Sequence, residues 1–140
     1  MHYLDTSVLV AAVSAETATD RVQEWLSQQE PESLCISNWV QTEFSAALSM
    51  KVRLQMISEE SRSQKLRDFD RLCDEHLFVF ATTASHFARA RTLADRHMLG
   101  LRAGDALHLA IAGEHGATLF SLDKRLVQAS LSTGIRASLI

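Results

Sequence analysis

The sequence predicts an α/β domain with a central parallel β-sheet of about five strands, flanked by helices. Short apolar segments alternate with longer segments whose apolar residues recur at helical spacing, as in parallel α/β folds. Only five Gly and one Pro occur among 140 residues, which indicates short connections between elements. No repeat, low-complexity tract or linker divides the chain, so residues 1–140 are expected to form one domain.

The first half of the chain predicts two strands and four helices. The strands are expected at 2–5 and 34–37, and the helices at 8–14, 18–29, 38–51 and 59–75. Thr6 or Ser7 can cap the first helix, and Ser37 or Asn38 can cap the third. The last helix is charged and carries an apolar stripe made of Leu66, Phe69, Leu72 and Cys73. We expect this stripe to pack into the core rather than to bind a partner.

The second half predicts strands at 77–81 and 117–121, a weaker strand at 135–139, and helices at 83–98, 104–114 and 124–132. The helix at 83–98 is expected to turn Phe87, Ala90, Ala94 and Met98 toward the core. The helix at 104–114 is apolar nearly all round, so it is expected to be buried on several sides.

Composition excludes several classes of protein. The hydrophobic fraction of 46% and charged fraction of 22% are ordinary for a soluble domain. No apolar stretch is long enough to span a membrane, and the run Val8–Val13 is too short and has no preceding Lys or Arg to act as a signal. Cys35 and Cys73 lack metal-ligand spacing, and free thiols fit a reducing cytoplasm.

Four acidic residues interrupt this pattern. Asp5 and Asp123 directly follow predicted strands, where they either cap the next helix or line a ligand site at the carboxyl ends of the strands. Glu43 lies in an apolar helix stripe, and no Lys or Arg stands three or four residues away to pair with it. Either Glu43 binds a ligand there, or it lies at the edge of the stripe and reaches water. Asp105 stands in the first turn of the most apolar helix, a position that the helix dipole also favours.

Together these positions indicate an acidic site on one side of a parallel sheet. Carboxylates gathered there would repel one another unless a cation lay between them. Oxygen ligands suit Mg²⁺ or Mn²⁺, and no His and Cys set suggests zinc. His108 is expected to be packed or to support a ligand. Subtracting the four acids from the formal charge of −3 leaves +1, which keeps a nucleic-acid substrate open.

The acids also lie in four ordered motifs that resemble the PIN domain, and more narrowly the VapC-type ribonuclease toxins of toxin–antitoxin operons. The motifs are Tyr3–Leu9, Val40–Phe44, Gly104–Ala110 and Ser121–Leu126. The resemblance covers the whole chain in order and length. It implies a PIN-like parallel sheet of about five strands, a small antitoxin as partner and a homodimer.

The resemblance also implies roles for single residues. Asp5, Glu43 and Asp105 match the three most typical metal-site acids, and Asp123 matches a more variable fourth. Hydroxyl groups are expected beside them at Thr6, Ser7 and Ser121. The activity implied is Mg²⁺- or Mn²⁺-dependent endoribonuclease cleavage that leaves a 5′-phosphate and a 3′-hydroxyl. The basic residues next to the acid motifs can bind RNA phosphates: Arg102, Lys124 and Arg125.

Two other functions remain open from the residues alone. The Asp-Thr-Ser opening is similar to that of phosphatases in which an aspartate attacks phosphorus, although Ser7 occupies the place of their second Asp. In the other alternative the acids only cap helices, and the protein is a non-catalytic binding module.

Overall fold

Five parallel strands form the sheet in the computed structural model, which describes residues 1–140. They are β1 (His2–Leu4), β2 (Leu34–Ser37), β3 (Phe78–Phe80), β4 (Thr118–Ser121) and β5 (Ala137–Leu139). Their order across the sheet is β3-β2-β1-β4-β5, so the first strand of the sequence lies in the centre. In register, His2 pairs with both Leu34 and Thr118. All carboxyl ends therefore lie at one edge of the sheet, and the predicted fold class is confirmed.

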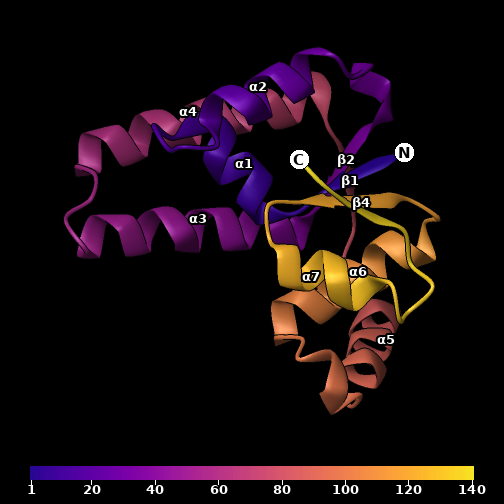
Figure 1. Ribbon diagram of the computed structural model, residues 1–140. Helices are drawn as coiled ribbons and strands as arrows, with labels where there is room; N and C mark the ends of the chain where they lie inside the picture. Colours follow the sequence, from indigo (N-terminus) through magenta and orange to yellow (C-terminus); the bar gives the residue numbers. More distant parts are fainter.

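Seven α-helices connect and cover the strands. They are α1 (Thr6–Val13), α2 (Thr19–Ser27), α3 (Asn38–Arg53), α4 (Glu59–His76), α5 (Ala84–Ala94), α6 (Ala103–Glu114) and α7 (Lys124–Ser130). Short 3₁₀ turns occur at η1 (Pro31–Ser33) and η2 (His97–Leu99). Helices α1–α4 form one lobe, with α3 and α4 projecting from the sheet, and α5–α7 lie together in the other (Figure 1).

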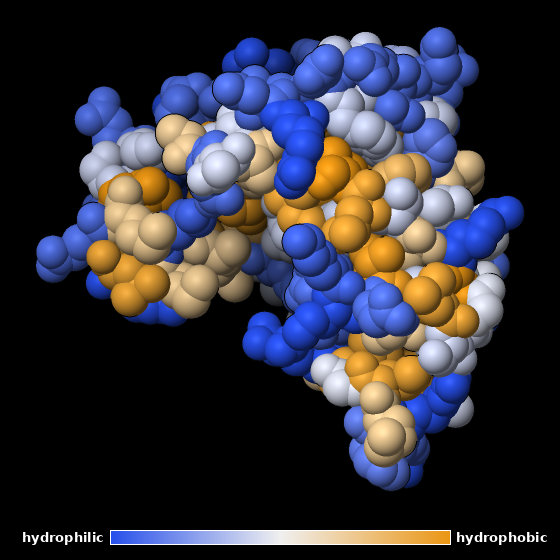
Figure 2. Space-filling model, in the orientation of Figure 1, coloured by the Kyte–Doolittle hydropathy of each residue, from blue (hydrophilic) through white to orange (hydrophobic).

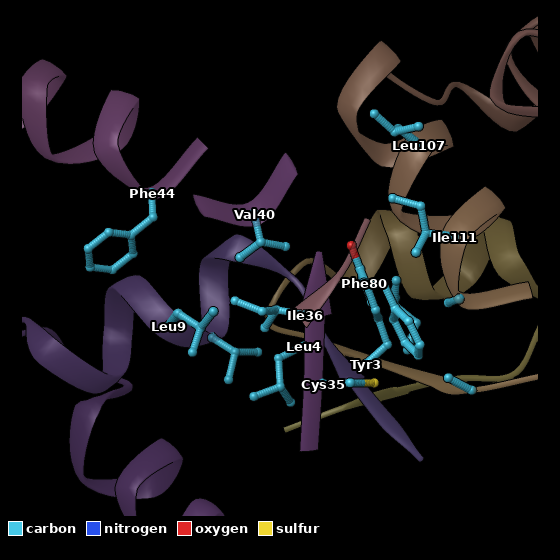
Figure 3. Close-up of a cluster of buried hydrophobic side chains, with 14 of the residues drawn as sticks. Tyr3, Leu4, Leu9, Cys35, Ile36, Val40, Phe44, Phe80, Leu107 and Ile111 are labelled. Carbon is cyan, nitrogen blue, oxygen red and sulfur yellow. The ribbon is translucent and has the colours of Figure 1, made fainter. Parts of the chain in front are cut away.

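The core lies on both faces of the sheet. Figure 3 shows Leu4, Ile36 and Phe44 on the face covered by the first lobe. Tyr3 and Ile111 lie on the opposite face, as the alternation of side chains along a strand requires. Two features expected from the sequence are confirmed. Helix α6 is buried from Ala106 to Ala112, and the apolar stripe of α4 packs into the core through Phe69 and Cys73.

Helix α5 differs from its prediction in both length and orientation. It ends at Ala94, and Met98 lies in the separate turn η2 with 85% of its surface exposed. Ala90 is buried as expected, but Ala94 is exposed and Phe87 is 54% exposed. The other buried positions of the helix are His86 and Leu93. The inner face of α5 thus includes a polar residue, because His86 Nδ1 accepts the Thr83 N–H and Nε2 lies 3.3 Å from Glu114 Oε1 of α6.

Both cysteines are buried free thiols, as expected. Burial raises the pKa of Cys35 to about 12 and that of Cys73 to about 11, which keeps both protonated at neutral pH. None of the helices has the length and apolar character needed to cross a membrane.

Candidate active site at the carboxyl edge of the sheet

Asp5 is the most enclosed of the four acids, with 4% of its surface exposed. Its backbone N–H donates to the carbonyl of Phe120, which fixes it between β1 and β4. Its Oδ1 accepts hydrogen bonds from the N–H and hydroxyl of Ser7 and from the N–H of Val8, and so caps α1. The predicted cap at Thr6 or Ser7 is wrong by one or two positions, because Thr6 already begins the helix.

A single hydroxyl links Asp5 to Asp123. The Ser121 hydroxyl donates to Asp5 Oδ2 and accepts from the Asp123 N–H at 2.8 Å. Asp123 Oδ1 in turn accepts from the N–H groups of Arg125 and Leu126, so Asp123 caps α7. Helix capping and a place in the acidic site are therefore compatible roles for both aspartates.

Glu43 reaches from α3 toward both lobes. Its Oε2 accepts the hydroxyl of Thr6 at 2.5 Å and lies 2.7 Å from His108 Nε2 on α6. Burial raises the pKa of Glu43, but the hydrogen bonds and positive potential of His108, with the Thr6 bond, outweigh it, so the net pKa is lowered. Glu43 is thus held as a carboxylate with 27% of its side chain exposed.

A buried chain of polar side chains leads from Ser37 through Tyr3 and His108 to Glu43. The Tyr3 hydroxyl lies 2.8 Å from Ser37 Oγ and 3.1 Å from His108 Nδ1. One consistent arrangement has Ser37 donating to Tyr3, Tyr3 to Nδ1, and the N–H at Nε2 to Glu43. Such partners fix the orientation of a carboxylate. The supporting role expected of His108 fits this contact.

Tyr3 and Ser37 were not predicted. A signal exists in the sequence, because Tyr3 and Asp5 are two residues apart and therefore point to the same face of an extended chain. At Ser37 the sequence predicts only a helix cap. It does occupy that position of α3, but its hydroxyl makes no cap bond and points to Tyr3 instead.

Asp105 lies in the first turn of α6, where its Oδ2 accepts the backbone N–H of Arg102 at 3.0 Å. The adjoining Gly104 brings this turn against Glu43, since a Cβ placed on Gly104 would lie 2.6 Å from Glu43 Oε1. The absence of a side chain at Gly104 therefore allows Glu43 to lie against the helix that carries Asp105.

The four acids thus lie along one edge of the sheet, and three residues connect them. Ser121 bonds to Asp5 and Asp123, Thr6 next to Asp5 bonds to Glu43, and Gly104 lets Glu43 lie against the helix of Asp105. As the side chains stand, no three His, Cys, Asp or Glu residues form a group that could hold a metal ion. Direct chelation by all four acids therefore remains a prediction. The donor chemistry nevertheless fits Mg²⁺ or Mn²⁺, because all four are carboxylates and Asp105 Oδ1 and Asp123 Oδ2 make no hydrogen bond within the protein.

The three basic candidates border this edge. Arg102 is the residue before α6, and Lys124 and Arg125 are the first two residues of α7. All three are exposed and none forms an ion pair within the chain. Figure 2 shows the surface hollowed between the lobe that carries α3 and the lobe that carries α7.

Gly104→Ala tests the contact between Glu43 and α6. Alanine favours a helix by about 1 kcal/mol over glycine, and the atom it meets is the movable end of a side chain. We expect the Tm to stay within a few degrees while the Kd for Mn²⁺ rises about 10-fold. Calorimetric titration and thermal unfolding measure both. An unchanged Kd would mean that the position of Glu43 does not matter to the site.

The fold and the site together define a class of protein: an α/β domain with acidic and hydroxyl side chains at the carboxyl edge of a five-stranded parallel sheet. The PIN domain family matches residues 2–130, and the chain belongs to that family. Among proteins with curated descriptions, none is significantly similar to this chain in sequence.

Solved structures share the fold at low sequence identity. FitAcB from Neisseria gonorrhoeae is 19% identical, with a TM-score of 0.72 over 98% of this chain and 96% of that one. A sarcin-ricin loop cleaving VapC toxin from Mycobacterium tuberculosis is 18% identical, with a TM-score of 0.75 over 92% and 95%. A promoter-bound VapBC complex from Rickettsia felis is 17% identical, with a TM-score of 0.71 over 100% and 99%. At these identities the similarity establishes the fold.

Proposed function

We propose that this chain is a metal-dependent endoribonuclease and the toxin of a toxin–antitoxin pair. The observation that carries the proposal is the row of four acids along one sheet edge of a PIN domain, in which Asp105 and Asp123 each keep a free carboxylate oxygen. The phosphatase alternative gains no support. Such an enzyme needs a second Asp two residues after the first, and Ser7 stands there with its hydroxyl bonded to Asp5 Oδ1.

The residues that would hold Mg²⁺ or Mn²⁺ are Asp5, Glu43, Asp105 and Asp123. A metal bound there would lower the pKa of a water molecule and neutralise charge on the scissile phosphate. The chain supplies the rest. Thr6 and His108 fix Glu43, and the hydroxyls of Ser7 and Ser121 fix Asp5.

Substrate binding is assigned to the basic residues at the starts of α6 and α7, namely Arg102, Lys124 and Arg125. As free cations beside the acids, they would bind phosphates on either side of the cleaved bond. Water is the nucleophile in this scheme and no side chain becomes covalently attached. The expected products carry a 5′-phosphate and a 3′-hydroxyl.

The biological setting is proposed from relatives. Structural neighbours from Neisseria gonorrhoeae and Rickettsia felis are described as FitAcB and VapBC assemblies, which supports an antitoxin as partner. A homodimer is also expected, and the exposed Phe87 lines an apolar pocket with Trp39 and Leu107 that a second copy could cover. The two free thiols suit a reducing cytoplasm.

The test combines chemistry and growth. Purified protein incubated with structured RNA should cut it in Mg²⁺ and not in EDTA, and sequencing of the ends should find 5′-phosphates. Expression of the wild type alone should arrest growth, and Glu43→Gln should relieve the arrest. Cutting that is equal in Mg²⁺ and EDTA would exclude the metal mechanism, and equal toxicity of Glu43→Gln would remove Glu43 from the site.

A further inference from the structure

A second surface feature adjoins the acidic edge. It is a groove of about 520 Å³ between helix α7 and turn η2, a size within the range of ligand-binding pockets. The residues that define it are Lys124, Arg125, Gln128 and Ser132 on one side and Met98 and Leu99 on the other. We call this feature the α7–η2 groove.

The α7–η2 groove shares helix α7 with the acidic site. Asp123 caps α7, and Lys124 and Arg125, the next two residues of the chain, line the groove. Arg96, the residue before η2, donates from Nη2 to the carbonyl of Ser132 at 2.8 Å. This bond links the two walls of the groove, because Ser132 lies just after α7 and lines the groove.

The lining has the chemistry of a nucleotide site. Lys124 and Arg125 supply two positive charges, and no carboxylate lines the groove. Gln128 offers an amide that can donate to and accept from a base edge. Met98 is 85% exposed and presents a flexible apolar side chain opposite α7. Hydrophilic residues gather over α7 where the molecule is hollowed (Figure 2).

We propose that the α7–η2 groove binds the single-stranded RNA nucleotide next to the cleaved bond. Lys124 and Arg125 bind its phosphates, Met98 and Leu99 contact the face of its base, and Gln128 reads the base edge. This inference rests on the proposed ribonuclease function and assigns that site its flanking subsite. RNA is favoured over a protein segment because both charges in the lining are positive and follow the acid Asp123 directly in the chain.

The first experiment measures binding without cleavage. In an Asp105→Asn background, a fluorescent single-stranded RNA is titrated in Mg²⁺ at several salt concentrations. The double change Lys124→Gln with Arg125→Gln should raise the Kd at least 10-fold and lower the slope of log K against log salt by about 1.4, since each lost phosphate contact contributes about 0.7. The matched control is Arg67→Gln with Arg71→Gln on the exposed face of α4, which should change the Kd less than 2-fold.

The second experiment tests base contact. Gln128→Ala with Met98→Ala should raise the Kd several-fold and leave the salt slope unchanged, because neither residue carries charge. Unchanged affinity in both groove doubles, or equal loss in the α4 control, would overturn the subsite. So would a Lys124 and Arg125 double that keeps its RNA affinity but loses binding to a poly-glutamate peptide, since the occupant would then be protein.

Failure of the proposed function is separable from failure of this subsite. Wild-type protein that binds RNA through the α7–η2 groove but does not cut it in Mg²⁺ would refute the ribonuclease and leave the groove standing. Cleavage in Mg²⁺ with no dependence on the groove residues would give the opposite result.

Discussion

Asp105→Asn is expected to lower the rate of RNA cleavage about 10³-fold. A metal ion supplies several kcal/mol of stabilisation to the charged transition state, and each 1.36 kcal/mol corresponds to a factor of ten. The amide oxygen of Asn can still accept the Arg102 N–H, so the turn that begins α6 should persist. We therefore expect the free energy of unfolding to change by less than about 0.5 kcal/mol. Initial rates and urea unfolding measure the two effects.

The matched control for that change is Asp70→Asn, the same substitution at an exposed position of α4. It removes one negative charge far from the acid row and should leave the cleavage rate within 2-fold of the wild type. If Asp105→Asn cuts at the wild-type rate, the acid of α6 does not belong to the active site. Loss of both activity and stability would instead assign Asp105 to the fold.

Phe44→Ala is expected to have the largest effect on stability, about 3–5 kcal/mol. The Phe44 ring is wholly buried and stacks on Phe69 of α4, with ring centroids 3.9 Å apart and planes at 15°. Its removal would leave a cavity between α3 and α4 and lower the Tm by roughly 10–20 °C. Differential scanning calorimetry measures this loss directly.

Phe87→Ala provides the comparison because it removes the same side chain from α5. Phe87 is 54% exposed, so we expect a loss below about 1 kcal/mol. Equal losses at Phe44 and Phe87 would mean that α5 packs through the face the apolar pattern predicted, and that the orientation described above is wrong.

The strands and most helices could be predicted because their apolar residues follow a clear period. Leu34–Ser37 is buried along its whole length, as a central strand of a parallel sheet requires. The burial of helix α6 is likewise predicted by its sequence, which is apolar nearly all round. These elements depend on hydrophobicity alone, which a linear pattern records well.

Helix α5 could not be oriented in this way because its buried face includes a polar residue. His86 is 1% exposed and faces Glu114, while Phe87 beside it points outward. A pattern that counts only apolar residues selects Phe87 and Ala94 in place of His86 and Leu93, although it places Ala90 correctly. Burial of His86 depends on its contacts with Thr83 and with Glu114, 28 residues away, which hydrophobicity does not record.

The sequence reveals the acids of the candidate site because they interrupt the apolar pattern. It does not reveal the residues that position them, such as Tyr3. Tyr3 reads as an ordinary aromatic residue of a strand, and its contact with His108 spans 105 positions of sequence. The sequence also offers capping and metal binding as alternatives at Asp5 and Asp123. In the structure one oxygen of Asp123 caps a helix while the other stays free, so a single carboxylate can do both.

The central place of β1 affects when the protein can become active during synthesis. Asp5 leaves the ribosome early, yet the serine that bonds to it lies 116 residues further along the chain. Until β4 emerges and pairs beside β1, the nascent polypeptide has only part of its acidic edge. We therefore expect chains that stop before Ser121 to be inert, so that the cell is not exposed to a partly finished nuclease.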